Sequence, residues 1–492
     1  MSYLKNYLQR VPEKERTSAA IAYMASLDAV QGAYPEIAQS IVKELKDQRV
    51  YLKLIASENF SSLPVQLAMG NLFTDKYSEG YVGHRFYAGC ENVDEVEGMA
   101  NELAKKLFGA EHAYVQPHSG ADANLVAFWS ILVQRIQSKE IEKLGKKSLD
   151  ELTPEEYERV RQLLVNQKMI GMSLGAGGHL THGYLHNISA KIMRASTYDV
   201  DLKTGLLDYS ALKKQVEREK PLILIAGYSA YPRQLDFAKM REIGDQVGAV
   251  LLVDMAHFAG LVAGGVMKGD FNPVPFAHII TSTTHKTLRG PRGGLVLCKA
   301  EFKDAVNKGC PIVLGGPLPH VMAAKAIAFK EALAPEFSRY THQIVENSRA
   351  LAENLMHQGV RVLTGGTDNH LLVFDVGASF GLTGRQAENV LREAHLTVNR
   401  NMIPQDVNGP WYTSGIRIGS PAVTTLGMKK EQMKEIASII CDLLKEAKIP
   451  LDERTNLPSR AKATVPEPVV HRARARVAEI LKHFPLYPEL VI

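Results

Sequence analysis

The sequence predicts an α/β protein in which a mainly parallel sheet is covered by helices and a smaller C-terminal α/β domain follows. Between about residues 108 and 300, short β-rich apolar runs alternate with helical stretches, and the clearest runs are residues 222–225, 250–253 and 278–281. This alternation is typical of β-α-β units, whose parallel strands are buried on both faces. After about residue 320, helices rich in Ala and Lys lead to a second α/β pattern at residues 371–374 and 396–399.

The length of the chain predicts several folding units. With 492 residues, 45% of them hydrophobic, the chain can bury more than one core, and roughly 150 residues per domain gives about three units. We expect an N-terminal helical arm over residues 1–50, a large domain over 51–330 and a small domain over 331–492. Residues 18–50 carry apolar positions at helical spacing, so these helices either wrap a partner subunit or lie on the surface of their own.

Two further segments are predicted as surface features. Residues 134–170 are strongly charged, and residues 153–156 (Thr-Pro-Glu-Glu) have the pattern of a helix start, with a capping hydroxyl, proline at the first position and acids in the first turn. We therefore expect an inserted helical hairpin there. Residues 453–468 are rich in Pro, Arg and Thr and predict a loop before a last amphipathic helix near residues 470–483.

The composition argues against several classes of protein. A net charge of +5 on 58 basic and 53 acidic residues is small, and no dense Lys/Arg run indicates nucleic-acid binding. The chain has no run of about 18 apolar residues and no signal-peptide pattern, so we expect a soluble cytoplasmic protein without a membrane partner. The cysteines lack the spacing of a metal site or of a disulfide framework and are expected to be reduced thiols: Cys90, Cys298, Cys310 and Cys441.

One lysine lies in an unusual loop. Residues 281–294 (Thr-Ser-Thr-Thr-His-Lys-Thr-Leu-Arg-Gly-Pro-Arg-Gly-Gly) follow an apolar strand and place Lys286 among hydroxyls and glycines. In a dry pocket its amine would have a lowered pKa and could form a Schiff base with an aldehyde cofactor, while the hydroxyls and backbone N–H groups could hold a phosphate. The alternative is a polar loop with a solvated lysine.

A carboxylate follows the strand upstream of that loop. In residues 250–257 (Val-Leu-Leu-Val-Asp-Met-Ala-His), Asp254 lies at the exit of a buried strand, where open α/β sheets bind ligands. An ionised Asp there would keep a cationic ring nitrogen protonated, as pyridoxal phosphate requires. The alternative is that Asp254 caps the next helix.

These motifs closely resemble those of serine hydroxymethyltransferases, a family of fold-type I pyridoxal-phosphate enzymes. Further motifs in family order lie at residues 54–59, 77–81, 116–120, 177–183, 365–370 and 413–417. The resemblance implies a large domain with a mainly parallel seven-stranded sheet between helices, a smaller C-terminal α/β domain and an N-terminal helical arm. It also implies the reversible transfer of the serine hydroxymethyl carbon to tetrahydrofolate, which gives glycine and serves one-carbon metabolism and amino-acid biosynthesis.

The resemblance also implies a role for each residue around the cofactor. Lys286 would form the Schiff base, Asp254 would pair with the ring nitrogen, and His179 would stack on the ring. Ser229 and His257 would bond near the phenolic oxygen. The phosphate would be held by Ser119, Gly120 and His285, and from the neighbouring subunit by Tyr77, Gly315 and Gly316. The family pattern therefore predicts an obligate homodimer, and pairing of dimers into tetramers stays open.

The substrate residues are implied in the same way. Arg417 would grip the amino-acid carboxylate, since its planar fork makes two hydrogen bonds, and a surface ion pair is the alternative. Glu79 would handle the proton of the serine hydroxyl and Tyr87 would lie beside the amino acid, unless both are structural. Ser57 would bond the amino acid, and Leu174, Gly178, Leu180 and Asn401 would line the folate. His118, His182 and His370 receive no role.

Departures from the family pattern leave some alternatives. Ala121 stands where the family usually has a serine, which predicts weaker cofactor binding, and Leu314 stands where the family usually has a glutamine before Gly315 and Gly316. The rival enzymatic interpretations are a folate-independent aldolase or an amino-acid racemase, and the rival from another class is a silent binding protein. Dependence on folate would distinguish a hydroxymethyltransferase from the aldolase and the racemase. An absorption band of bound cofactor would distinguish an enzyme from a silent binding protein.

Overall fold

The structure, a computed structural model, describes residues 2–452 and 456–492 and divides the chain into two compact units. Unit 2 comprises Asn71–His342 and Ile403–Gln405. Unit 1 comprises the chain up to Gly70, Gln343–Met402 and Asp406–Ile492. The N-terminal helices therefore belong to the same unit as the C-terminal segments, and the three-part division with boundaries near residues 50 and 330 stays a prediction.

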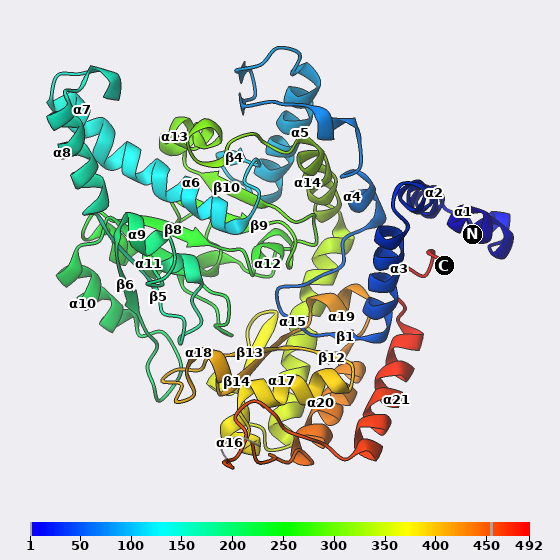
Figure 1. Ribbon diagram of the computed structural model, residues 1–492. Helices are drawn as coiled ribbons and strands as arrows, with labels where there is room; N and C mark the ends of the chain where they lie inside the picture. The colour runs from blue at the N-terminus through cyan, green and yellow to red at the C-terminus, as the bar shows by residue number, and fades with distance from the viewer. Residues whose placement is uncertain (1, 453–455) are drawn as a thin grey trace. The chain divides into compact units, whose positions relative to one another are not determined.

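Unit 2 is built on a seven-stranded sheet of order β4-β10-β9-β8-β7-β5-β6 (Figure 1). Its strands are β4 (His112–Tyr114), β5 (Lys168–Met172), β6 (Arg194–Tyr198), β7 (Ile223–Gly227), β8 (Val250–Asp254), β9 (Ile279–Thr283) and β10 (Gly294–Cys298). The strands from β9 to β6 pair in parallel, whereas β10 runs antiparallel to both β9 and β4. The predicted mainly parallel sheet is confirmed.

The central strands are buried on both faces because helices cover both sides of the sheet, and their polar residues lie toward the carboxyl ends of β8 and β9. Every residue of β7, β8, β9 and β10 is buried. Alternate residues such as Ile223, Val250 and Leu252 join one core with Phe128 and Ile131 of α6 (Gly120–Leu132). Because strand side chains alternate, the intervening residues face the opposite side.

The other helices and strands of unit 2 connect or cover this sheet. They are η2 (Leu72–Asp75), β2 (Gly80–Tyr81), β3 (His84–Arg85), α5 (Glu91–Phe108), η3 (Val133–Gln137), α7 (Ser138–Lys143), η4 (Leu149–Glu151), α8 (Pro154–Val165), η5 (Leu180–His182), α9 (Ser189–Ile192), α10 (Tyr209–Glu219), α11 (Phe237–Asp245), α12 (Ala259–Ala263), η6 (Gly269–Phe271), η7 (Ala300–Phe302), α13 (Lys303–Asn307), η8 (Cys310–Leu314) and α14 (Pro319–Ala332). α15 (Pro335–His357) begins in unit 2 and ends in unit 1.

The charged insertion forms the expected helical hairpin. α6 continues through η3 into α7, and α8 returns beside η3 (Figure 1). Thr153 caps α8 in a capping box with Glu156, and Pro154 is the first helical residue, as the sequence predicts. The hairpin is held by an ion pair between Arg159 and the buried Glu140, with 2.5 Å between Nη2 and Oε1.

Unit 1 contains two small sheets and the remaining helices. The three-stranded antiparallel sheet has the order β11-β14-β13, and β1 pairs in parallel with β12. These elements are β1 (Leu52–Lys53), β11 (Leu371–Asp375), β12 (Leu396–Thr397), β13 (Asn399–Asn401), β14 (Gly415–Gly419), α1 (Tyr3–Arg10), η1 (Glu13–Glu15), α2 (Ser18–Ala33), α3 (Pro35–Val50), α4 (Leu63–Leu67), η9 (Leu363–Gly365), α16 (Val376–Phe380), α17 (Gly384–Glu393), α18 (Gly409–Tyr412), α19 (Pro421–Thr425), α20 (Lys430–Lys445) and α21 (Glu467–His483).

The N-terminal helices pack on the C-terminal tail of their own chain. Met24 and Leu27 of α2 share a core with Leu486 and Leu490. Arg49 of α3 donates hydrogen bonds to three carbonyl oxygens of that tail, at 2.6–3.0 Å. This packing supports the alternative in which the helices lie on their own subunit.

Two other expectations concern the C-terminal part of the chain. The last helix is confirmed and begins slightly earlier than predicted, at Glu467. In the predicted loop, residues 453–455 lie outside the described residues. Throughout the described ranges, no helix is both long and apolar enough to cross a bilayer.

Candidate functional site

The predicted cofactor residues of unit 2 gather at one edge of its sheet. Asp254 ends β8, and the segments that follow β4, β5, β7 and β9 carry, in that order, Ser119, His179, Ser229 and Lys286. Because these five strands point the same way, their carboxyl ends share an edge. Residues spread over almost 170 positions of sequence are thereby brought to one place.

Asp254 is a buried carboxylate that accepts three hydrogen bonds. Its side chain ends β8, and the residue is 7% exposed. Oδ2 accepts from Asn124 Nδ2 at 2.9 Å and from His182 Nε2 at 3.0 Å, while Oδ1 accepts from the Ala256 N–H at 3.0 Å. Burial alone would raise the pKa of Asp254, but the hydrogen bond from His182, with smaller contributions from His179 and Asn124, holds that pKa below its usual range.

The hydrogen bonds of His182 define its tautomer. Its Nδ1 accepts from the backbone N–H of His179 at 3.3 Å, so the proton of the neutral ring belongs on Nε2, which donates to Asp254. His182 is 1% exposed and lies in the short helical turn η5. The turn therefore aims a hydrogen-bond donor at the carboxylate.

A polar network connects this carboxylate to His179. Asn124 Nδ2 also donates to Thr181 Oγ1 at 2.8 Å, and that hydroxyl lies 2.8 Å from His179 Nδ1. The ligand atoms of His179, His182 and Asp254 lie within 4.8 Å of one another, a spacing that would also suit a metal ion. Both nitrogens of His182 are already engaged in hydrogen bonds, so this set fits an organic cation at Asp254 better than a metal.

Lys286 lies in a loop that hydrogen bonds close tightly. The Gly290 N–H donates to the Thr284 carbonyl at 2.7 Å, and the Thr284 hydroxyl donates to the Pro291 carbonyl at 2.6 Å. Arg289 adopts a left-handed conformation at φ 59°, which makes the turn. Lys286 is only 9% exposed, which contradicts a fully solvated lysine.

The loop of Lys286 is joined to the segment after Asp254. Thr287 Oγ1 donates to the His257 carbonyl at 2.9 Å and accepts from the Gly260 N–H at 3.0 Å. His257 itself is 3% exposed. These bonds fix the two segments that carry the predicted lysine and the predicted partner of the phenolic oxygen.

The loop between β5 and η5 owes its course to glycines. A Cβ at Gly178 would lie 1.9 Å from the Met172 carbonyl oxygen, and one at Gly177, whose φ is +108°, would lie 2.6 Å from the Tyr231 nitrogen. The Gly177 carbonyl accepts from the Ser229 N–H at 2.7 Å, so the loop is tied to the segment after β7. Leu180, predicted to line the folate, is 46% exposed beside this loop, and Leu174 is partly buried within it.

The start of α6 has the features of an anion site. Ser119 caps the helix by accepting from the Asp122 N–H at 3.1 Å, although its hydroxyl also donates to the Asp122 carboxylate. A Cβ at Gly120 would lie 2.8 Å from Thr283 Cγ2, so only glycine allows this close packing. Nδ1 of His285 is buried and, among the described residues, has no hydrogen-bond partner. A helix N-terminus with an unsatisfied donor nearby suits a phosphate.

A second group of predicted residues surrounds the β2–β3 hairpin. The Tyr77 hydroxyl donates to Glu79 Oε1 at 3.2 Å, and the Tyr77 and Tyr87 rings lie 4.9 Å apart in an edge arrangement. The charge of Glu79 raises the pKa of Tyr77. A Cβ at Gly316 would lie 3.3 Å from Tyr77 Cζ, and Gly315 has φ +76°. The tyrosines are 55% and 45% exposed, so this group lies on the surface of unit 2.

Three predicted substrate residues lie in unit 1. Arg417, on β14, donates from Nε to Asn399 Oδ1 at 3.1 Å across the strand pair, and burial lowers its pKa to about 10. Asn401 ends β13 opposite Gly415. The segment before Ser57 reaches the same sheet, because the Gly419 N–H donates to the Leu54 carbonyl at 2.8 Å. Arg417 is therefore a partly buried arginine rather than one of an exposed ion pair.

Sequence reasoning missed the partners of Asp254. His182 received no role, and Asn124 was not considered, although both donate to the carboxylate. The spacing of His179 and His182 on one helical turn was an available signal. Asn124 carried none, because it lies within an apolar helix and its role depends on where α6 meets β8.

Together these residues fit the reactive ends of pyridoxal phosphate. Asp254 offers an ionised carboxylate to the ring nitrogen, Lys286 offers an amine to the aldehyde, and the α6 N-terminus with His285 offers donors to the phosphate. The unsatisfied nitrogen of His285 and the pKa of Asp254, which stays low despite burial, are the observations that support this fit.

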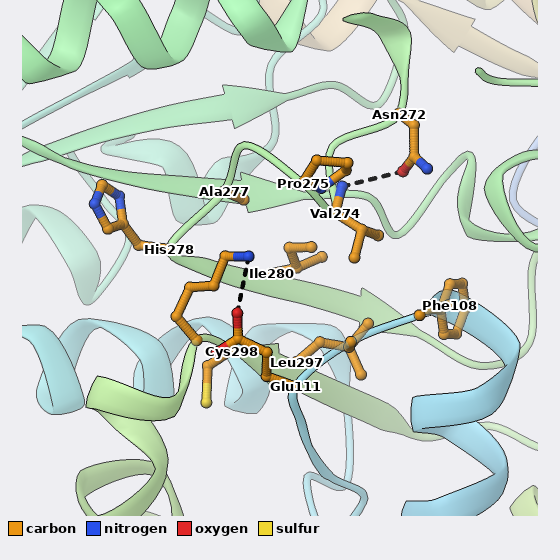
Figure 2. Close-up of a pocket in the computed structure, with 13 residues that line it drawn as sticks. Phe108, Glu111, Asn272, Val274, Pro275, Ala277, His278, Ile280, Leu297 and Cys298 are labelled. Atoms are coloured by element: carbon orange, nitrogen blue, oxygen red, sulfur yellow. Dashed lines mark hydrogen bonds and ion pairs between the residues drawn. The ribbon is translucent and has the colours of Figure 1, made fainter. Parts of the chain in front are cut away.

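A separate cavity of about 400 Å³ lies near the start of β9, at the edge of the sheet opposite Asp254 (Figure 2). Its polar side chains are already engaged. Glu111 pairs with Lys299 at 3.1 Å, Asn272 Oδ1 accepts from the Val274 N–H, and His278 Nδ1 accepts from the Leu251 N–H. The cavity contains none of the predicted site residues, so we assign it no chemistry.

Comparison with known proteins agrees with the geometry. The sequence model of the family described as serine hydroxymethyltransferase matches residues 30–143 and 157–440, leaving out the tip of the α7–α8 hairpin. A serine hydroxymethyltransferase of Treponema pallidum (strain Nichols) is 57% identical over 489 residues, covering 99% of this chain and 85% of that protein. One from Chlamydia trachomatis serovar D is 53% identical, covering 99% and 98%. One from Cutibacterium acnes is 54% identical, covering 96% of each. The chain therefore belongs to the serine hydroxymethyltransferase family.

Proposed function

We propose that the carboxyl edge of the unit 2 sheet is the catalytic site of a serine hydroxymethyltransferase. The chain is a pyridoxal-phosphate-dependent transferase that interconverts serine and glycine with tetrahydrofolate as co-substrate. The observation that carries the proposed site is Asp254, a buried carboxylate that its neighbours hold ionised. A buried carboxylate of this kind needs a cationic partner.

The residues around the cofactor act by binding and by holding protons. Pyridoxal phosphate, when bound, supplies an aldehyde for an amine and a ring that takes up the electrons released at the substrate carbon. Asp254 keeps the ring nitrogen protonated, and His182 and Asn124 keep Asp254 ionised. Lys286 would provide the amine for the aldehyde. His179 would cover one face of the ring, and Ser229 and His257 would bond near its phenolic oxygen.

The substrate residues select which bond breaks by orienting the amino acid. Arg417 binds the carboxylate with two hydrogen bonds, and Ser57 and Tyr87 hold the same substrate. Glu79 takes and returns the proton of the serine hydroxyl. The hydroxymethyl carbon passes to tetrahydrofolate, for which Leu174, Gly178, Leu180 and Asn401 form the lining.

A homodimer with shared sites is part of the proposal. Exposed apolar side chains crowd the surface around the β2–β3 hairpin, where Leu72 is 88%, Phe86 71% and Tyr77 55% exposed. Burying such a surface against a second copy would be favourable. Tyr77, Gly315 and Gly316 would then reach the phosphate of the partner's cofactor, and Glu79 would serve the same site.

We also propose a cytoplasmic location. In the part of the chain that the structure describes, Cys90, Cys298, Cys310 and Cys441 are free and buried. Burial raises the pKa of Cys298 to about 12 and that of Cys441 to about 11, so these thiols are unreactive. Such thiols suit a reducing compartment.

The test of this function is transfer of labelled hydroxymethyl carbon from serine to tetrahydrofolate by the purified protein with pyridoxal phosphate. We expect turnover that depends on tetrahydrofolate and is lost in Lys286→Ala. Lys330→Ala, an exposed lysine on α14, is the matched control and should leave the rate unchanged. Amino-acid cleavage or racemisation without any dependence on tetrahydrofolate would contradict the transferase function.

A further inference from the structure

A buried lysine lies close to the proposed phosphate site but outside the residues assigned above. Lys325 of α14 is 1% exposed, and its Nζ donates to the carbonyl oxygens of Val115 at 2.5 Å, Pro117 at 3.0 Å and Gly294 at 2.9 Å. These bonds use all the donors of an ammonium group. All three acceptors are neutral carbonyl oxygens. Burial lowers the pKa of Lys325 to about 7, while the charges of Glu97 and Asp122 act to raise it, so a nearby anion would favour the charged form of this lysine.

Two of these carbonyls belong to the segments beneath the start of α6. Pro117 lies two residues before Ser119, and its carbonyl also accepts from the Gly294 N–H at 2.8 Å. A Cβ at Gly294 would lie 2.2 Å from the Ser119 carbonyl oxygen, so the two segments are in close contact. Lys325 thus ties together the backbone that supports Ser119 and Gly120.

The charge of Lys325 also acts on His285, another residue of the proposed phosphate site. The pKa of His285 falls to about 3, first because of burial and then because of the positive charges of Arg292, Lys286 and Lys325. Its Nδ1 is one of the buried atoms without a partner among the described residues. Burial disfavours any charge there, but the three neighbouring positive charges favour an anion beside His285.

We propose that Lys325 is a positioning residue for the cofactor phosphate, which holds Pro117 and Gly294 in place under Ser119 and stabilises the anion by its charge without touching it. This inference rests on the proposed phosphate site at Ser119, Gly120 and His285. A lysine that served only as a structural strut would affect every ligand of the pocket alike. A lysine that acts on the phosphate affects only ligands that carry one.

The test compares pyridoxal phosphate with pyridoxal, which lacks the phosphate. Each is titrated into the full-length apoprotein, and the Kd is measured from the absorption of the bound cofactor. For Lys325→Met we expect the Kd of pyridoxal phosphate to rise about tenfold or more while that of pyridoxal changes less than about threefold, because a charge acting on the anion is lost. Lys330→Met, on the exposed face of the same helix, is the matched control and should change neither Kd.

A second variant guards against a folding defect. Lys325→Gln keeps a hydrogen-bond donor and removes the charge, and we expect the same selective loss in it; urea unfolding of each apoprotein establishes that it is folded. The proposal would be overturned if both dissociation constants changed by the same factor, if neither changed, or if both variants failed to fold. Lys325 would then be a structural residue.

Ser119→Ala separates this inference from the site on which it rests. The relevant ratio is the Kd of pyridoxal divided by the Kd of pyridoxal phosphate. If this ratio falls in Ser119→Ala but stays at the wild-type value in Lys325→Met, only the inference about Lys325 fails. If Ser119→Ala also leaves the ratio unchanged, the proposed phosphate site itself is wrong, and the inference falls with it.

Discussion

At the scale of single residues, the charge of Asp254 depends on neighbours that are distant in the sequence. Asn124 donates from α6 and His182 from η5, and each reaches the same oxygen. Hydrogen bonds to a buried charged group contribute about 1.5–3 kcal/mol each. Without them, burial would raise the carboxyl pKa, and the site would lose the negative charge that pairs with a cationic ring.

Replacing His182 tests this dependence. In His182→Phe the largest influence that lowers the pKa of Asp254 is lost while burial remains, so that pKa rises. We expect the acid limb of the kcat profile to move to higher pH and kcat to fall about 10- to 100-fold. His182→Gln, which can still donate, should recover part of the loss. An unchanged acid limb in His182→Phe would show that this histidine does not control Asp254.

The lowered pKa of Asp254 also determines how its contribution to the free energy of unfolding changes with pH. A carboxylate whose folded-state pKa lies below its usual value stabilises the fold above the unfolded-state pKa of about 3.9, and this contribution disappears as the pH falls through the folded-state value. For the wild-type protein that window lies below about pH 4. Urea unfolding of His182→Phe apoprotein should show this window narrowed from its acid side, because the folded-state pKa rises toward the unchanged unfolded-state value.

Residue identity alone predicted only part of the site. Lys286 and Asp254 were recognisable because each lies in a distinctive motif directly after a strand. Lys325 was not, because a lysine within a helix is most often solvated, and its burial follows from the packing of α14 on α5 and the strand ends. His182 was left without a role because its partner lies 72 positions away.

At the scale of elements, the long central strands could be predicted from the sequence, whereas the pairing of the short strands could not. The central strands were predictable, since burial on both faces demands apolar runs such as those of β7 and β8, whereas β9 is apolar only at Ile279 and Ile280. The predicted strand at residues 396–399 is divided into β12 and β13, which pair in different sheets. Sheet partners of short strands depend on distant segments, so this division was not readable from local pattern.

The loop between β5 and η5 yields a prediction for glycine. In Gly178→Ala, the new methyl group would meet the Met172 carbonyl oxygen at 1.9 Å, so the loop must move. We expect a loss of about 1–3 kcal/mol in the free energy of unfolding and a fall of about 100-fold in transfer to tetrahydrofolate. Urea unfolding and the labelled-carbon assay measure the two effects.

Gly98→Ala is the matched control for that change. Gly98 lies within α5, and a Cβ there would meet no atom within 4 Å. Alanine in a helix interior should stabilise by about 0.5–1 kcal/mol and leave transfer unchanged. If Gly178→Ala behaved like Gly98→Ala, the loop would not have the course described here.

At the scale of the whole molecule, the proposed dimer divides each site between two chains. The exposed group of Tyr77, Glu79 and Tyr87 would then complete the partner's site at Lys286. Lys286→Ala damages one half of the site and Glu79→Gln the other. In a mixed dimer, one site receives both defects and the other receives none.

Mixing the two inactive variants therefore tests the shared site. After unfolding and refolding together in equal amounts, half of the dimers should be mixed, and transfer activity should return to about a quarter of the wild-type value. Each variant refolded alone provides the baseline. No recovery, in samples that sedimentation shows to be mixed dimers, would place both groups of a site in one chain.

The central claim is that Asp254 holds a cationic ring nitrogen, and nitrogen-15 NMR tests it most directly. The measurement is the chemical shift of the ring nitrogen in labelled pyridoxal phosphate bound to the wild-type protein at neutral pH. We expect the shift of a protonated nitrogen, which Asp254→Asn should convert to that of a neutral one. A neutral-nitrogen shift in the wild-type protein would contradict the claim.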